Sequence, residues 1–228
     1  MIGWEIPGPY IVGFTTRDGG VSEGPFASLN LGSKGDSPAR IAENRRLACA
    51  ALGLDADRLA VNRQRHTPHV HRARPGARDE SGDGLWTDEP GVPMLALSAD
   101  CVPIAVATTA GPPALAVIHA GWRGLAAGIV EEGVRALGGA ETAAIVGPAV
   151  GPCCYEVGPE VSARFDDDLT HDRLLDLWAA SERALRRAGV STASRVDLCT
   201  RCNPELFFSH RRDGDRRGAQ GVIGAVAG

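Results

Sequence analysis

The sequence predicts an α+β fold, in which mixed β-sheets are flanked by helices within one layered domain spanning residues 1–228. Short apolar stretches of strand length often follow one another with no helix between them, unlike the strict alternation of a doubly wound parallel sheet. The chain is 43% hydrophobic, which is enough apolar material to bury one sizeable core. Its 29 glycines and 15 prolines indicate a chain that turns often.

The N-terminal part supplies the first strand and the first helix. We predict a strand at 11–15 and a helix at 38–52. Ser37 followed by Pro38 is typical of an N-cap and the first helical position. Gly53 then ends the helix.

The middle of the chain is expected to form short buried strands. A helix should follow the glycine-rich turn at 121–124 and end at Gly138, because its apolar residues recur at helical spacing. The stretch 74–84, rich in Gly, Arg and Asp, is interpreted as a surface loop or a lid over a site. The strands are expected at 94–97, 102–107, 115–118 and 143–146.

The C-terminal third is expected to add a helix at 172–188, which Asp172 would cap. A strand at 195–199, a short helix beginning at Asn203 and a last strand at 222–226 complete the predicted order.

Composition excludes some classes of partner. A formal net charge of −4 gives the chain no overall attraction to nucleic acid or to an anionic membrane. No apolar run reaches the ~18 residues of a membrane span, and the N-terminus has no signal-peptide pattern. We therefore expect a cytoplasmic protein, whose six cysteines would be reduced and available for metal binding, catalysis or burial.

Three segments place soft metal ligands at strand ends beside turns. They are residues 64–71 with His66, residues 99–103 with Cys101, and residues 118–124 with His119. Two imidazoles and one thiolate, with a fourth position open, are typical of a catalytic zinc site. Copper binds the same ligand types, so Cu²⁺ remains an alternative to Zn²⁺. Each residue alone also fits a plain buried or structural role, Cys101 as a small hydrophobe.

The other cysteines give weaker signals. Cys199 and Cys202 form a CxxC, but no second CxxC completes a structural zinc site, so we interpret them as buried or unpaired thiols. A redox pair is the alternative. Cys153 and Cys154 follow a Gly-Pro turn and are interpreted as structural.

Seven motifs in order carry a resemblance to a known family. They resemble those of the laccase-domain family, first described as multicopper polyphenol oxidases and now regarded as zinc-dependent purine nucleoside phosphorylases. The family includes the bacterial peptidoglycan editing factor. The similarity runs from Val12 to Gly218. The motifs are residues 15–22, 28–32, 64–66, 99–103, 119–124, 147–157 and 207–214.

The resemblance implies roles for particular residues. It implies that His66, Cys101 and His119 are the metal ligands and the catalytic residues. It also implies phosphorolysis of adenosine, inosine, guanosine and methylthioadenosine, with adenosine deamination as a second activity. The expected partners are thus purine nucleosides and inorganic phosphate.

Six further residues are candidates for substrate binding by their position in these motifs. Arginine binds phosphate bidentately, while amides and carboxylates bond ribose or base. For each arginine the alternative is a solvated surface charge. The candidates are Arg17, Asn30, Gln64, Asp100, Arg123 and Arg212.

The chain departs from the family pattern at two points and carries two additional histidines. Thr67 follows the first ligand where the family has glycine, so the backbone there is expected to differ. His69 and His71 are additional and are either competing ligands or solvated. The C-terminal motif is out of register, which leaves open whether Arg216 or Arg217 replaces the family arginine.

Four functional hypotheses follow. The first is the zinc-dependent phosphorylase with deaminase activity. The second is a copper-dependent polyphenol oxidase, although a four-copper laccase needs more imidazoles than the six present. The third is a hydrolase of peptidoglycan precursors on a cysteine-hydrolase-like layered fold, with Cys101 as nucleophile and His119 as base. The fourth is a metal-storage or interaction module. The preferred nucleoside and the oligomeric state stay open.

Overall fold

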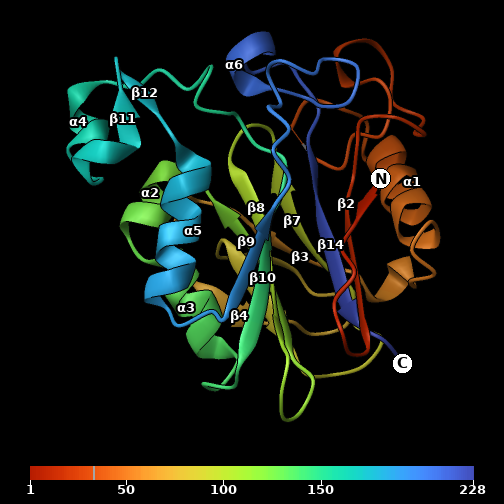
Figure 1. Cartoon of the computed structure of the whole chain (residues 1–228). Helices are drawn as coiled ribbons and strands as arrows, with labels where there is room; N and C mark the ends of the chain where they lie inside the picture. Colours follow the sequence, from red (N-terminus) through yellow and green to blue (C-terminus); the bar gives the residue numbers. More distant parts are fainter. Residues whose placement is uncertain (33) are drawn as a thin grey trace.

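The predicted α+β class is confirmed by a computed structural model, which describes residues 1–32 and 34–228 except for the side chain of Asp79. Two mixed six-stranded sheets pack face to face in the described part of the chain. Helices cover the outer face of each sheet, which gives four layers (Figure 1). None of the helices in the described ranges is both long and apolar enough to cross a membrane.

The first sheet is built around the C-terminal strand. This strand, β14, pairs antiparallel with β2 on one side and with β7 on the other, while β3 lies parallel to both β7 and β5. The strands in spatial order are β1 (Ile2–Gly3), β2 (Tyr10–Phe14), β14 (Gln220–Val226), β7 (Met94–Ser98), β3 (Ala60–Arg63) and β5 (Arg78–Ser81).

The second sheet has the antiparallel pair β8 and β9 at its centre. Strand β10 is antiparallel to β8, and β6 is antiparallel to β9. The spatial order is β13 (Thr192–Arg195), β10 (Thr142–Val146), β8 (Val102–Thr108), β9 (Leu115–Ala120), β6 (Gly84–Thr87) and β4 (Val70–Arg72). A separate small sheet pairs β11 (Thr170–His171) with β12 (Leu174–Leu175).

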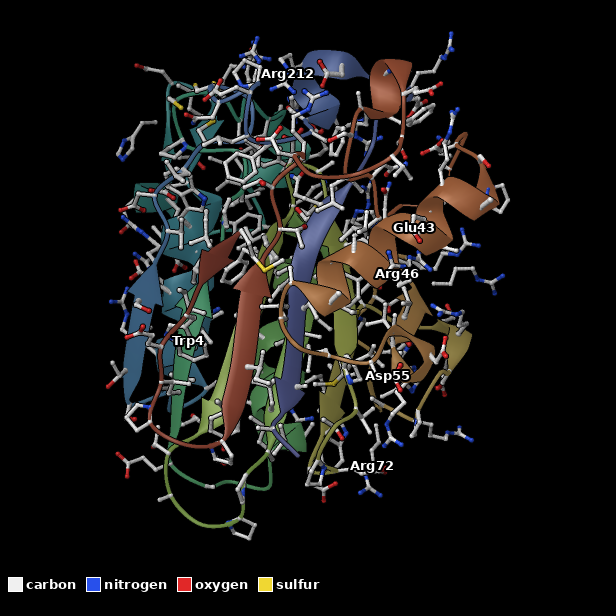
Figure 2. All side chains as sticks on the ribbon, turned by 90° about the vertical axis from the view of Figure 1, so that its right-hand side faces the viewer. Trp4, Glu43, Arg46, Asp55, Arg72 and Arg212 are labelled. Carbon is white, nitrogen blue, oxygen red and sulfur yellow. The ribbon has the colours of Figure 1, made fainter. Side chains whose placement is uncertain are left out.

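The helices are divided between the two outer faces and one end of the molecule. Helix α1 (Pro38–Ala50) covers the first sheet, and Figure 2 shows its Glu43 and Arg46 side chains on the solvent side. Helices α2 (Trp122–Ala126), α3 (Ile129–Ala136) and α5 (Leu177–Arg187) cover the second sheet (Figure 1). Helices α4 (Pro159–Ser162) and α6 (His210–Asp213) lie at the upper end in that view. Single 3₁₀ turns lie at Gly24–Phe26, Ala56–Arg58 and Asp167–Leu169.

Three apolar cores hold the layers together. The core between the two sheets includes Phe14 and Leu115. The core between the second sheet and the helices that cover it includes Ile118 and Ile129. The core beneath α1 includes Leu31. Burial of a large aliphatic or aromatic side chain contributes about 1.5–3 kcal/mol, so these contacts fix the relative position of the sheets.

Several predicted elements have different bounds in the structure. The predicted helix from 121 to 138 is two helices, because Gly128 adopts a left-handed φ of 86° between α2 and α3. The predicted helix at 172–188 begins only at Leu177, where the Asp176 side chain accepts a hydrogen bond from the Ala179 N–H. Asp172 instead turns between β11 and β12 with φ 46°.

Two C-terminal predictions are wrong. The strand expected at 195–199 lies earlier, as β13, and Cys199 makes only an isolated bridge to Ala149. The helix expected at Asn203 is a turn, since the Phe207 N–H reaches the Asn203 carbonyl without a helix continuing. The predicted loop at 74–84 contains the strand β5.

The topology brings the predicted ligand segments to one end of the molecule. The start of β8 pairs with the end of β9, so the residues before Val102 lie beside those after Ala120. Strand β3 runs parallel to β7, and both end on the same side. His119 lies near the end of β9, His66 follows the end of β3, and Cys101 links β7 to β8, so the three residues meet at this one end of the sheets.

Candidate metal centre and substrate cleft

His66, Cys101 and His119 lie together. Their ligand atoms are all within 4.8 Å of one another, and the Cys101 Sγ is 3.8 Å from the His66 Nε2. The two imidazole rings meet edge to face with centroids 4.9 Å apart. His119 is buried, Cys101 is half-buried and His66 is exposed. The three ligand atoms thus surround one point that is open to solvent on the His66 side.

A buried carboxylate, Asp83, organises this group. Its Oδ1 accepts hydrogen bonds from the His119 Nδ1 (2.8 Å) and the His66 backbone N–H (2.9 Å). Its Oδ2 accepts from the Arg65 N–H, the Thr67 N–H and the Thr67 hydroxyl. Because Asp83 occupies Nδ1, the Nε2 of His119 is the nitrogen free to bind a metal.

The electrostatics of the group favour the charged forms of Asp83, Cys101 and His119. Burial alone would raise the pKa of Asp83, but hydrogen bonds from His119, Thr67 and Arg65 hold it well below its usual range. Burial opposes ionisation of Cys101 too, yet His119 and His66 lower the pKa of Cys101 to about 6. Burial would lower the pKa of His119, but Cys101 and Asp83 raise it to about 9. Cys101 is therefore a thiolate at neutral pH, as a metal ligand must be.

The backbone at the site is shaped for close approach. A Cβ added to Gly121 would lie 2.7 Å from the His66 Cδ2 and 3.0 Å from the Cys101 Sγ, so only glycine fits there. His66 has a left-handed φ of 60°, and Asp100 one of 96°. Non-glycine residues in this conformation are held by their surroundings and cluster at functional sites. At Thr67 the departure from the family pattern adds a hydroxyl donor to Asp83 that glycine lacks.

A cleft of about 680 Å³ opens beside His66 and Cys101. This volume is within the range of small-molecule sites. Its walls combine aromatic rings with cationic side chains. The lining includes Trp122, Tyr155, Arg123, His210, Arg211 and Arg217, together with His66, Asp100 and Cys101.

Two of the six predicted substrate-binding residues line the cleft. Asp100 does so, but its carboxylate already accepts from the Thr200 hydroxyl and the Arg211 N–H, each at 2.6 Å. Arg123 packs its guanidinium over the Trp122 ring at 4.3 Å. No hydrogen bond from its side chain joins any residue that the structure describes, which leaves its donors available to a ligand.

The other four predicted substrate-binding residues do not line the cleft. Arg17 donates to the carbonyls of Ala27 and Pro204, and Gln64 exchanges two hydrogen bonds with the Leu97 backbone. Asn30 is buried and bonds Asp36, Gly32 and Ala219. Arg212 donates to the carbonyls of Thr200 and Phe207. These contacts hold loops in place around the site.

The structure adds residues that the sequence analysis did not single out. Asp83 stands between two glycines in a charged stretch, which suggested a solvated loop. Arg211 donates to the Glu156 carbonyl and lies over the Tyr155 ring at 4.5 Å.

Of the two C-terminal arginines that the sequence analysis left open, Arg217 lines the cleft and Arg216 does not. His69 and His71 lie outside the three-ligand group, with His71 bonded to the Ser81 carbonyl.

Fold and site together define a class of enzyme-like αββα proteins with a His₂Cys centre beside a cationic cleft. The chain belongs to the family described as multi-copper polyphenol oxidoreductase laccase, whose model matches residues 11–226. The resemblance predicted from the motifs is thereby confirmed.

Relatives of known name carry a phosphorylase designation. The chain is 36% identical to "Purine nucleoside phosphorylase YlmD" of Geobacillus stearothermophilus, covering 96% of this chain and 89% of the relative. It is 38% identical to a "Purine nucleoside phosphorylase" of Deinococcus radiodurans, covering 92% and 87%. The crystal structure of a Neisseria meningitidis protein superposes with a TM-score of 0.89 at 32% identity, covering 100% of this chain and 99% of that one.

Proposed function

We propose that this chain is a zinc-dependent purine nucleoside phosphorylase that also deaminates adenosine. The observation that carries the proposal is the position of the His₂Cys group, of which His66 and Cys101 line a cleft together with arginines and aromatic rings. The names of two relatives support the phosphorylase activity in this proposal. The substrates proposed are adenosine, inosine, guanosine and methylthioadenosine.

The residues present fit a tetrahedral metal with an open position. His66, Cys101 and His119 would supply three ligands, and Asp83 would orient His119 from behind, as carboxylates do for metal-bound histidines. A bound zinc ion would supply Lewis acidity and an acidified water. Copper accepts the same ligands, and the two imidazoles gathered among the described residues are fewer than a multicopper oxidase requires.

The remaining residues suit phosphorolysis. In this reaction a phosphate oxygen bonds to C1′ of the ribose, the C1′–N9 bond breaks, and the purine leaves with a proton. Arg123, Arg211 and Arg217 line one cleft and would hold the phosphate through charge-assisted hydrogen bonds. The rings of Trp122 and Tyr155 offer apolar surface for the base.

The direct test is product analysis on one metal-defined sample. Inosine and phosphate should give hypoxanthine and ribose 1-phosphate with the zinc-loaded protein, and adenosine should give inosine. Chelation should remove both activities, and zinc should restore them. Inertness of the zinc-loaded protein toward adenosine, inosine and methylthioadenosine would refute the proposal. Phenol oxidation restored only by copper would favour the oxidase instead.

Replacing Arg123 by Ala should weaken phosphate binding. A hydrogen bond to a charged group contributes about 1.5–3 kcal/mol, so the KM for phosphate should rise about 10- to 100-fold while the KM for inosine changes little. Arg135→Ala is the matched control, because among the described residues the Arg135 side chain makes one exposed ion pair, with Glu132 on α3. Steady-state kinetics with phosphate varied at saturating inosine measures the effect. Equal phosphate KM values in the two variants would contradict a phosphate role for Arg123.

Zinc binding at this centre should strengthen as pH rises. Zinc needs His119 neutral, whereas in the metal-free protein its pKa is raised to about 9, so zinc must displace one proton below that pH. Apparent affinity should therefore fall about tenfold per unit from pH 9 toward 6, and more steeply below 6, where Cys101 also takes up a proton. The free zinc concentration that half-restores activity to chelated protein, measured from pH 6 to 9, checks this slope. A flat profile across that interval would contradict it.

A further inference from the structure

A second group of sulfur atoms lies apart from the His₂Cys centre. The Sγ atoms of Cys153, Cys154, Cys199 and Cys202 are all within 4.8 Å of one another. The Cys202 Sγ is 3.7 Å from that of Cys153 and 3.4 Å from that of Cys154. The interpretation of these cysteines as unpaired or merely structural thiols has to be revised, because two pairs distant in sequence meet in space.

Each pair is presented by its own turn. In the first, the Gly151 carbonyl accepts from the N–H groups of Cys154 and Tyr155. In the second, the Asn203 N–H donates to the Cys199 carbonyl. The two turns face each other, so each contributes two sulfurs. The four-cysteine group could not be predicted from spacing, because an adjacent Cys-Cys pair takes the place of a second CxxC.

We propose that these four cysteines form a structural zinc site. Four zinc–sulfur bonds of about 2.3 Å in a tetrahedron place neighbouring sulfurs about 3.8 Å apart. The separations of 3.4 and 3.7 Å at Cys202 are close to that value. Four thiolates, with no oxygen or nitrogen ligand in the group, form a soft ligand set that favours zinc over magnesium, calcium and manganese.

The surroundings of the sulfurs fit a bound thiolate. The Gly151 N–H donates to the Cys199 Sγ at 3.2 Å, and backbone donors of this kind stabilise the charge on metal-bound sulfur. A Cβ on Gly151 would lie 3.3 Å from the Cys153 Sγ and 2.8 Å from the Trp178 ring, so glycine allows the turn to close. Cys153 and Cys202 are exposed, which gives an ion access from solvent.

The site would fasten the wall of the substrate cleft. Tyr155, which lines the cleft, directly follows the first turn. Thr200 lies in the second turn, where its hydroxyl donates to Asp100 and its carbonyl accepts from Arg212. One ion bound to both turns closes a loop of about 50 residues, which restricts the unfolded chain and stabilises this end of the molecule. The proposal does not depend on the phosphorylase activity.

Metal analysis of the full-length protein tests the site directly. Protein purified without chelator should contain two zinc ions per chain, and Cys202→Ser or Cys153→Ser should contain one. Cys101→Ser should also contain one zinc ion, the one bound by the four cysteines. Cobalt substitution should give the intense visible bands of a tetrathiolate site in the wild type and in Cys101→Ser, but not in Cys202→Ser. Cys49→Ala is the matched control, because Cys49 is a free thiol within the core beneath α1, and it should keep both ions.

Two further measurements test whether the variants are folded and whether the cysteines are reduced. Circular dichroism should show native spectra for Cys202→Ser and Cys153→Ser, whose exposed side chains contribute little packing. Thiol titration of the denatured wild type with chelator should find all six cysteines reduced. Fewer thiols, which would reveal a disulfide, or an unchanged zinc content in both folded variants, would overturn the proposal.

Discussion

Cys101→Ser is expected to abolish phosphorolysis while leaving the protein folded. Serine is nearly isosteric with cysteine, and Cys101 is half-buried at the cleft wall, so the packing loss is small. Its hydroxyl stays protonated near neutral pH and is a poor zinc ligand, whereas the Cys101 thiol is already ionised there. Loss of a metal that stabilises the transition state by several kcal/mol lowers kcat by about 10³-fold or more.

His66→Ala should have the same effect and offers a sharper control. His69 lies three positions further along the same segment, is also exposed, and is outside the ligand group. His69→Ala should therefore retain metal and activity within about twofold of wild type, a difference of only ~0.4 kcal/mol. Metal content and kcat measured on His66→Ala, His69→Ala and Cys101→Ser would separate the hypotheses. Full activity in Cys101→Ser would exclude both the metal centre and the hydrolase with Cys101 as nucleophile.

The fold was largely predictable where local and tertiary preferences agree. Ser37 and Pro38 mark the start of α1, and Gly53 follows its end with a left-handed φ of 69°. The central strands were predictable because each is a short apolar run buried between layers. The start of α5 was not, since both Asp172 and Asp176 are plausible caps and only tertiary packing selects the second.

The site was predictable only as far as its motifs reach. His66, Cys101 and His119 stand in recognisable segments, and the structure places them together. Asp83 was missed because a lone aspartate between glycines gives no periodic or spacing signal, although its five hydrogen bonds hold the centre. Arg17 illustrates a second limit of sequence reasoning, because the sequence cannot show that a guanidinium is already bonded to backbone carbonyls.

Replacing Asp83 is expected to have the largest effect on stability. Its side chain is fully buried and accepts from three backbone N–H groups, one hydroxyl and one imidazole. An alanine side chain would leave these donors without their acceptor, at about 1–3 kcal/mol for each one that water cannot reach. If water fails to reach two or three of these donors, the free energy of unfolding falls by several kcal/mol, out of a typical total of about 5–15 kcal/mol. Asp83→Ala should therefore lower Tm by about 10 °C or more, measured by differential scanning calorimetry.

Asp83→Asn separates the effect on the metal from the effect on folding. Asparagine keeps the shape and one acceptor oxygen, but it loses the negative charge and turns an NH₂ group toward backbone donors. The His119 imidazole then has a weaker partner at Nδ1, so its Nε2 is a poorer ligand and zinc affinity should fall about 10- to 100-fold. Asp88→Asn is the matched control, since the one ion pair of the Asp88 carboxylate within the described ranges is an exposed pair with Arg72. Competition with a chromophoric chelator measures the affinities. Because folded Asp83→Asn retains all three proposed metal ligands, wild-type zinc affinity in that variant would show that the buried carboxylate serves folding alone.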